Sequence, residues 1–426
     1  MKLVLAELVY AVSEALDCLE KYFFGITSNH SRRVSYMSSL MAEEMGIDER
    51  KRVLLTEAAA LHDNALSEFF RDWASPAYEG EREMARLFFE NAEKEKFDPL
   101  DYSKELPVWT ENMLLQHCKN GEENMKLMPF YEEVKDVILY HHERADGYGP
   151  FKMKTEEIPL FSRLIHMADH LDVEFHLHEI PREKYDRVCA YVRDQIGVAF
   201  DREVAEAFLS SFTYERAQAM TGNKVRSLLM ERLPHEKEEV TGRELKKIAG
   251  LFAKIIDYKS GFTCRHSLGI AEKSARMAEW YGWDQEAQDE MYFTGALHDL
   301  GKLMTSEDIL EKPAKLTDEE YKEIKNHALG TYHILRTVTG LEEITLWASL
   351  HHEKLDGTGY PFCLKADDLG MKERLMACLD IYQALTEERP YKKGLSHEKT
   401  ISMMKQNVEQ GKLDGDLVRD LDRCFG

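Results

Sequence analysis

The chain has 426 residues, a formal net charge of −22 and 43% hydrophobic residues, which is long enough for two or three domains with separate cores. So acidic a surface offers no favourable partner to nucleic acid or to an anionic membrane, so we expect no DNA or RNA partner and no membrane partner. Its seven cysteines form no C-x-x-C pair, which suits a reducing compartment. We therefore expect a soluble, cytoplasmic protein.

The chain opens with an amphipathic segment that resembles neither a signal peptide nor a membrane span. The run MKLVLAELVYAVSEAL is interrupted by Glu7 and Glu14, which favours a helix of a globular domain. Almost every later segment shows the apolar period of helices, as in Ile270, Ser274 and Met277, and strand alternation is nearly absent. The sequence therefore predicts an all-α fold.

The first half of the chain carries a series of histidines and aspartates. In order they are His30, His62, Asp63, His117, His141, His142 and Asp169. After the His-Asp pair lies an insert, about 64–110, that is rich in aromatic and acidic residues and makes this stretch 26 residues longer than its counterpart in the second half. We interpret the insert as a further packing helix, or as a lid or contact surface over the first site.

The boundary between the halves is the polar stretch 234–242, PHEKEEVTG. Apolar periodicity lapses there, and proline and glycine punctuate the chain. We expect one domain over 1–233, a linker over 234–242 and a second domain over 243–426.

The second half repeats the series of the first. Its members are His266, His298, Asp299, His327, His351, His352 and Asp380. The single histidine precedes the His-Asp pair by 32 residues in both halves, and the third histidine precedes the His-His pair by 24 in both. Imidazole and carboxylate are ligands of divalent metals, so the repeat predicts two copies of one metal-binding helical domain, here called the first copy and the second copy.

Two motifs of the second copy are long and specific. The segment 298–302, HDLGK, is similar to the HD-x-G-K block, and 351–361, HHEKLDGTGYP, to the HHE-x-x-DG-x-GYP block, of the HD-GYP branch of the HD phosphohydrolase superfamily. The resemblance covers the second copy and, in decayed form, the first. It implies two tandem all-helical HD-type domains and a metal-dependent phosphodiesterase that opens a cyclic dinucleotide, chiefly cyclic di-GMP, to the linear product.

The resemblance also implies roles for residues of the second copy. One metal would be held by His266, His298, Asp299 and Asp380, and the other by His327, His351 and His352, with Asp299 shared. Asp299 and Lys302 are the expected catalytic residues, and the lysine would bind phosphate or assist the leaving group. The expected substrate contacts are Lys302, Gly359, Tyr360, Pro361, Arg389 and Lys392, the last two from the closing block that contains Arg-Pro-Tyr.

The second copy departs from the family pattern at two positions. Members with three metals carry a Glu one turn before the first histidine, where this chain has Phe262, and Ile26 stands there in the first copy. We therefore expect two divalent transition metals, with Fe, Mn, Co, Ni and Zn left open because mixed His and carboxylate ligation accepts several. Gln383 stands where many members have Asp, which weakens the closing block.

The first copy keeps the ligands but loses groups that would handle substrate. It has Asn64, Ala65 and Leu66 in place of residues 300–302, and its long motif, HHERADGYGP, has no Tyr between the last Gly and Pro. We expect it to bind metal, to lack activity on the same substrate, and to serve as a regulatory or structural partner that pairs with the second copy. Further homodimerisation stays open.

Two other functions remain as alternatives. The chain resembles HD phosphohydrolases broadly enough that another nucleotide or an alarmone is a possible substrate, although Gly359-Tyr360-Pro361 and Arg389 favour a cyclic dinucleotide. It is alternatively a non-catalytic signalling scaffold that responds to a cyclic dinucleotide. Lys302 argues against the scaffold for the second copy, whereas the first copy fits it well.

Overall fold

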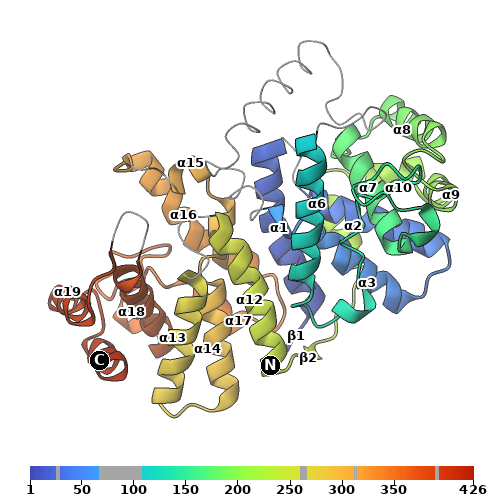
Figure 1. Ribbon diagram of the computed structural model, residues 1–426. Helices are drawn as coiled ribbons and strands as arrows, with labels where there is room; N and C mark the ends of the chain where they lie inside the picture. Colours follow the sequence, from blue (N-terminus) through green and yellow to red (C-terminus); the bar gives the residue numbers. More distant parts are fainter. Residues whose placement is uncertain (25–28, 67–107, 260–265, 311, 313, 389–392) are drawn as a thin grey trace. The chain divides into compact units, whose positions relative to one another are not determined.

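The structure, a computed structural model, describes residues 1–24, 29–66, 108–259, 266–310, 312, 314–388 and 393–426 (Figure 1). Across these residues the regular structure is helical apart from two short strands, β1 (Lys2–Leu3) and β2 (Glu238–Glu239). The predicted all-α fold is confirmed. No helix in this part of the chain is long and apolar enough to cross a membrane. Most of the predicted insert, residues 67–107, lies outside the described residues.

The described chain forms two compact units. The N-terminal unit is Leu16–Pro234, and the C-terminal unit joins Met1–Ala15 to His235–Gly426. One division between the units follows Pro234, and the predicted linker is 234–242. The first fifteen residues, which we expected in the first domain, are grouped with the second.

Main-chain contacts attach this first segment to the C-terminal unit. β1 pairs antiparallel with β2, and the Val4 amide donates a 3.0 Å hydrogen bond to the Thr339 carbonyl. Gly340 follows, with φ +102, and a Cβ there would lie 2.8 Å from Leu3 Cα and closer still to the Lys2 carbonyl oxygen. The segment is therefore held by long-range backbone bonds that leave no periodic signal in the sequence.

In the N-terminal unit, helix α2 lies against α3, α7, α9 and α11. The helices are α2 (His30–Glu44), α3 (Glu49–Ala60), α6 (Val108–Met125), α7 (Leu160–Phe175), α8 (Arg182–Asp194), α9 (Arg202–Ser211), α10 (Tyr214–Ala219) and α11 (Lys224–Met230), with short 3-10 helices η2 (Tyr131–Glu133) and η3 (Thr155–Glu157). Helix α1 (Leu5–Phe24) runs from the C-terminal unit into this one.

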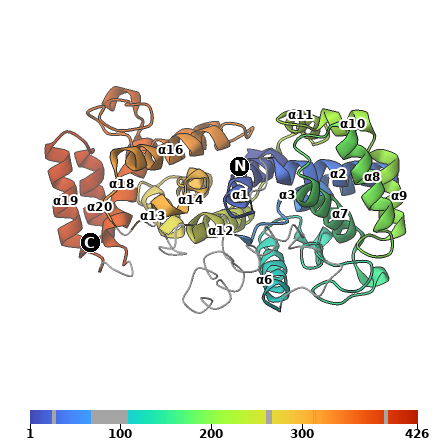
Figure 2. The ribbon, with the colours of Figure 1, turned by 90° about the horizontal axis from the view of Figure 1, so that it is seen from above.

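In the C-terminal unit, α13 and α14 run side by side, and α18 packs against α13 and α19 (Figures 1 and 2). A Cβ on Gly295 of α14 would lie 2.7 Å from the Ala271 backbone, so glycine permits this close packing. The helices are α12 (Gly242–Lys259), α13 (His266–Trp280), α14 (Gln285–Leu297), α15 (Glu307–Leu310), α16 (Asp318–Leu335), α17 (Glu342–Ser349), α18 (Met371–Thr386), α19 (His397–Glu409) and α20 (Gly415–Phe425), with 3-10 helices η4 (Leu300–Met304) and η5 (Ala366–Asp368).

Local sequence signals explain where the helices that carry site residues begin. α16 starts with a capping box in which Thr317 and Glu320 satisfy each other's backbone N–H groups, at 3.2 and 2.7 Å. Asp284 caps α14 by accepting from the Ala287 amide at 2.9 Å. These caps fix where each helix begins, and therefore which of its residues lie at the far end.

The packing of Gly340 against the first residues generates a stability prediction. Gly340→Ala should lower the free energy of unfolding by about 1–3 kcal/mol, because the new methyl group meets backbone atoms and the positive φ disfavours alanine. The matched control is Gly250→Ala in α12, where a Cβ meets nothing within 4 Å and the change should be neutral or stabilising by up to about 1 kcal/mol. Urea unfolding measures the free energy of unfolding of both variants. Equal changes in the two variants would contradict the close packing at Gly340.

Candidate metal centre

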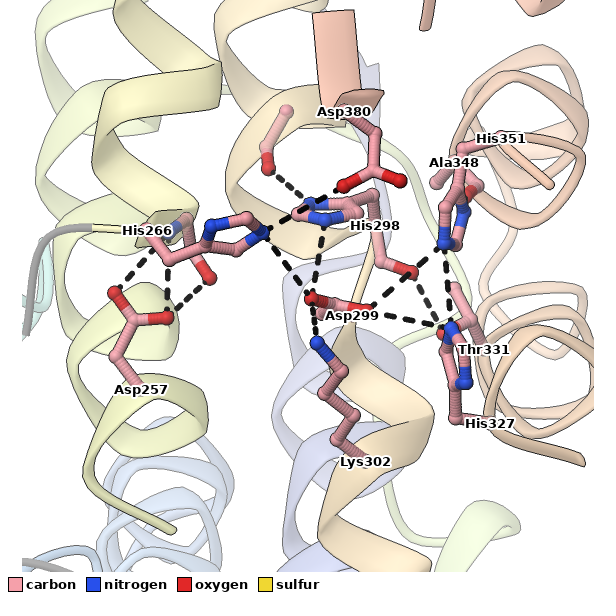
Figure 3. Close-up of polar contacts among 12 residues, drawn as sticks. Asp257, His266, His298, Asp299, Lys302, His327, Thr331, Ala348, His351 and Asp380 are labelled. Atoms are coloured by element: carbon pink, nitrogen blue, oxygen red, sulfur yellow. Dashed lines mark hydrogen bonds and ion pairs between the residues drawn. The ribbon is translucent and has the colours of Figure 1, made fainter. Parts of the chain in front are cut away.

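The structure brings all seven predicted ligands of the second copy together from five helices. Figure 3 labels each of them except His352. His266 is the first residue of α13, His298 and Asp299 follow α14, His327 lies in α16, His351 and His352 follow α17, and Asp380 lies in α18. Three sets have ligand atoms within 4.8 Å of one another: His266, His298 and Asp380; His327, His351 and His352; and His298, Asp299 and His351. The sets share His298 and His351, so they form one connected cluster.

Hydrogen bonds to the backbone orient three of these histidines. Nδ1 of His298, His327 and His351 lies 2.7, 2.6 and 2.6 Å from the carbonyl oxygen three residues earlier. A carbonyl only accepts, so each Nδ1 carries the proton and each Nε2 presents a bare lone pair. The helical turn before each ligand therefore aims Nε2 into the cluster.

Asp299 lies at the centre of the cluster. Its Oδ2 is 3.1 Å from Nε2 of His298 and 3.7 Å from Nε2 of His266, while its Oδ1 is 3.4 Å from Nε2 of His327 and 3.9 Å from that of His351. Burial by itself would raise the Asp299 pKa, but its contact with His298 and the nearby Lys302 ammonium hold it well below its ordinary value. One carboxylate therefore faces histidines on two sides, as a shared ligand must.

Asp380 closes the other side of the cluster. Its Oδ1 lies 3.7 Å from Nε2 of His266 and its Oδ2 lies 3.6 Å from Nδ1 of His352. Burial by itself would raise the Asp380 pKa, but the hydrogen bond from His266 and the nearby histidines lower it. Asp380 is therefore ionised and can act as a metal ligand.

The Nε2 lone pairs of His327 and His351 face each other, which bears on whether the site suits a cation. Nε2 of His327 lies 3.3 Å from Nε2 of His351, and both rings already carry their proton on Nδ1. Burial lowers the pKa of His327 to about 3 and that of His351 well below its ordinary value, so neither gains a second proton at neutral pH. Two buried lone pairs repel unless a cation lies between them, and the donor set therefore fits a divalent metal.

Lys302 lies beside the cluster and forms an ion pair with Asp299 Oδ2. Burial by itself would lower its pKa, but the Asp299 carboxylate raises it, so the side chain stays an ammonium ion. Gly301 allows η4 to approach α16, since a Cβ there would lie 2.6 Å from the Thr331 backbone nitrogen. Thr331 Oγ1 accepts from the Gly301 amide at 2.9 Å and donates to the His298 carbonyl at 3.0 Å, which fixes the turn that carries Lys302 (Figure 3).

The loop with Gly359, Tyr360 and Pro361 is held against the cluster by Glu353. The Glu353 carboxylate accepts from the amides of Phe362 and Leu364 at 2.7 and 3.0 Å. The Tyr360 ring lies 4.7 Å from the His352 ring between centroids, so the loop places an aromatic face beside the ligands. The other predicted substrate contacts, Arg389 and Lys392, lie outside the described residues.

Three further residues lie next to this centre and were not predicted from the sequence. Glu387 Oε2 is 3.0 Å from Nδ1 of His266, and Lys325 Nζ lies 5.5 Å from the Tyr360 ring and 4.5 Å from that of Tyr321. The positions of Lys325 and Tyr321, two and six residues before His327 in a helical segment, were a usable signal. Glu387 had a weaker signal, an acidic residue one turn after Gln383.

Asp257 was also missed, and it holds the residue after the first histidine. Its carboxylate accepts from the Ser267 amide at 3.1 Å and from the Ser267 hydroxyl. Burial raises the pKa of Asp257 to about 6. In the first copy Asp17 binds the amide and hydroxyl of Ser31 at 3.0 and 2.6 Å, so a Ser after the first histidine in both copies was the available signal.

The first copy forms a cluster of the same kind. Two sets have ligand atoms within 4.8 Å: Asp63, His117, His141 and His142; and His30, His62 and Asp169. Asp63 lies 3.2 Å from His62 and 3.0 Å from His117, as a shared carboxylate would. His62 and His141 donate from Nδ1 to carbonyls three residues earlier at 2.8 and 2.6 Å.

The first copy differs in the residues around its ligands. Leu66, buried, stands where the second copy has Lys302, and Asn64 is tied into hydrogen bonds with the Gly121 carbonyl and the Asn124 side chain. Glu143 still anchors its loop, accepting from the Phe151 and Met153 amides at 2.5 and 2.9 Å. The first copy thus keeps the arrangement of its predicted metal ligands but lacks the lysine beside them.

Two family models, both described as HD domain, match residues 27–174 and 250–417. The 3'3'-cGAMP-specific phosphodiesterase 1 of Vibrio cholerae is 29% identical over 428 residues, 96% of this chain and 89% of that protein. The 3'3'-cGAMP-specific phosphodiesterase 3 of the same organism is 30% identical over 314 residues, 72% of this chain and 67% of that protein.

A solved structure agrees with the fold. The crystal structure of a cyclic GMP-AMP specific phosphodiesterase of V. cholerae matches 100% of this chain and 98% of its own with a TM-score of 0.67, at 22% sequence identity. Each matched HD region contains one of the two ligand clusters. The chain therefore belongs to the HD-GYP-type phosphodiesterases and carries two HD domains in tandem.

Proposed function

We propose that the second copy hydrolyses a phosphodiester bond of a cyclic dinucleotide, and that 3'3'-cGAMP is preferred over cyclic di-GMP. The connected cluster around Asp299, with the Lys302 ammonium beside it, supports the reaction class. The base preference rests on the two relatives reported above, both of which are 3'3'-cGAMP-specific and cover 96% and 72% of this chain. The resemblance alone had favoured cyclic di-GMP.

We assign the ligands as the sequence analysis expected. Two divalent transition metals would be held by His266, His298, Asp299 and Asp380 on one side and by His327, His351 and His352 on the other, with Asp299 shared. When bound, such metals lower the pKa of water and offset charge on a phosphate. The carbonyl-bound Nδ1 protons keep Nε2 of three histidines available, and the ionised carboxylates supply the compensating negative charge.

Lys302 is the positively charged side chain that would contact the phosphate. Its raised pKa keeps it protonated at neutral pH, so its N–H groups can donate to a phosphate oxygen or to the departing 3' oxygen. The ion pair with Asp299 holds the ammonium within reach of the shared ligand. We therefore assign Asp299 and Lys302 as the catalytic pair.

Aromatic and cationic side chains beside the metals suit a nucleotide. Tyr321 is half exposed, and with Lys325 and Tyr360 it forms a wall on which a base could stack while the ammonium meets phosphate. Gly359 and Pro361 shape the loop, and Arg389 and Lys392 remain proposed phosphate contacts. The first copy has Leu115 at the position of Lys325, so its site lacks this cation as well.

We propose that the first copy binds metal through His30, His62, Asp63, His117, His141, His142 and Asp169 but does not hydrolyse the same substrate. The retained ligand geometry supports the first statement, and Leu66 in place of a lysine supports the second. Metal there stabilises the fold, since a ligand that binds only the native state adds free energy to it.

A substrate panel tests the proposed reaction. Metal-loaded protein should open 3'3'-cGAMP to the linear dinucleotide faster than cyclic di-GMP, as measured by chromatography of products. Asp299→Ala should abolish turnover, whereas Lys302→Ala should lower kcat by roughly 100-fold with metal content near normal. The exposed lysine variant Lys399→Ala is the control and should be unchanged. The proposal is wrong if no cyclic dinucleotide is opened, and the base preference alone is wrong if cyclic di-GMP is faster.

Metal binding should release protons at neutral pH. Burial by itself would lower the pKa of His266, but hydrogen bonds to Asp380 and Glu387 raise it to about 9, so the metal-free ring is charged at pH 7. A metal takes the neutral ring, so uptake should release about one proton from His266, and affinity should rise with pH until about 9. Without metal, this shift stabilises the fold below about pH 6.5, and that stability is lost as pH rises through 9. Calorimetry in two buffers of different ionisation enthalpy counts the protons, and pH-independent affinity would contradict the assignment.

The division of labour predicts a variant with lower stability and retained activity. His62→Ala with Asp63→Ala should remove metal from the first copy and lower Tm by several degrees, while phosphodiesterase activity survives. Elemental analysis and thermal melts measure the first two effects. Loss of turnover in a folded variant with a metallated second site would assign the chemistry to the first copy instead.

A further inference from the structure

The first ligand histidine of each copy differs from the others in its position on a helix. His30 begins α2 and His266 begins α13, so in the part of the chain that the structure describes no turn of the same helix precedes either ring. The carbonyl that orients His298, His327 and His351 belongs to the helical turn preceding each ring. A histidine at a helix start therefore needs a side chain from elsewhere to fix its tautomer and orientation.

In the first copy an aspartate from α7 provides this support. Nε2 of His30 lies 3.3 Å from the ligand Asp169, and its Nδ1 lies 2.7 Å from Oδ2 of Asp172, one turn further along the same helix. Arg33, fully buried, donates to both oxygens of Asp172 at 2.6 and 2.7 Å. The aspartate thus accepts from the ring on one side and is neutralised on the other.

The corresponding positions in the second copy carry different residues. Gln383 replaces the aspartate and Gly269 replaces the arginine. The glutamine packs onto the glycine, because a Cβ at 269 would lie 2.6 Å from Gln383 Nε2, and Gln383 Oε1 is buried with no hydrogen-bond partner among the described residues. This side chain therefore does not orient His266.

Glu387 occupies that role from one turn further along. It lies four residues after Gln383 at the end of α18, on the same face of the helix, and Oε2 is 3.0 Å from Nδ1 of His266. Its side chain is only 8% exposed. Nε2 of the same ring lies 3.7 Å from both Asp380 and Asp299, so the glutamate is behind the ring, away from the ligands.

We propose that Glu387 is the positioning residue of the His266 metal ligand, and that a carboxylate lost at 383 has been replaced by one at 387. The inference rests on the proposed metal ligands. A carboxylate behind Nδ1 fixes which ring nitrogen is free and raises the basicity of that nitrogen, so it strengthens the bond from Nε2 to a metal. Glu387 contributes no ligand atom itself.

Titration with Co²⁺, followed by its visible absorption, tests the proposal without using activity. The background is the full chain with His62→Ala and Asp63→Ala, so that binding reports on the second copy. Glu387→Gln should weaken Co²⁺ binding roughly 10- to 100-fold. Glu387→Asp, which keeps the charge, should lose less. The adjacent, exposed Glu388→Gln is the matched control and should bind as the background does.

A rescue variant distinguishes positioning from general damage. Gln383→Asp added to Glu387→Gln places a carboxylate where Asp172 stands in the first copy and should recover most of the lost affinity. In steady-state kinetics at limiting metal, Glu387→Gln should lower kcat with little change in KM, and excess metal should restore kcat.

Several outcomes would overturn the inference. Glu387 does not position His266 if Glu387→Gln binds Co²⁺ as the background does. The same holds if Glu387→Gln loses no more affinity than Glu388→Gln. If Gln383→Asp does not restore Co²⁺ affinity to Glu387→Gln, then Glu387 is not the equivalent of Asp172. If Asp299→Ala binds Co²⁺ unchanged, the ligand assignment fails and the inference fails with it. If Glu387→Gln behaves as expected but no cyclic dinucleotide is opened, only the proposed function fails.

Discussion

Mutual repulsion among buried, unprotonated imidazole nitrogens is the constraint on which the second copy depends. The facing Nε2 atoms of His327 and His351 lie 3.3 Å apart, and both side chains are buried. Without a cation, this arrangement costs free energy that the surrounding helices must supply. The capped helices, the close contact at Gly295 and the carbonyl bonds to Nδ1 hold the rings in place against that cost. The helices of the second copy thus hold together two nitrogen lone pairs whose repulsion only a cation would relieve.

The two copies show which parts of this arrangement can change independently. Both retain a shared aspartate between histidines, carbonyl-bound Nδ1 protons, and an acidic residue that ties down the serine after the first histidine. They differ in groups that we propose contact the substrate: Lys302 against Leu66, and Lys325 against Leu115. They also differ in how the first histidine is supported. Divergence has therefore left the ligand atoms in place and altered the groups behind and in front of them.

The sequence predicted which histidines and aspartates come together because much of their geometry is local. A histidine at the end of a helical turn hydrogen-bonds the carbonyl three residues earlier. The spacing of residues along the chain is therefore enough to identify it. Glu387 escaped prediction because its contact joins residues 121 positions apart, and a single glutamate one turn late carries no pattern. The grouping of residues 1–15 with the second half escaped for the same reason, since backbone pairing between β1 and β2 has no side-chain signature. The two substrate-binding predictions at 389 and 392 lie outside the described residues.

The pairing of β1 with β2 makes the C-terminal unit discontinuous in the order of synthesis. Its first fifteen residues leave the ribosome before the whole N-terminal unit, and their partners begin only at His235. At about 5–20 residues per second, that separation corresponds to roughly 10–45 s of translation. During that time Leu3, Val4 and Leu8, all buried in the finished fold, have no partner strand or core to cover them. The nascent chain must therefore protect this apolar segment while the intervening unit is made, a burden that a unit continuous in the sequence would not carry.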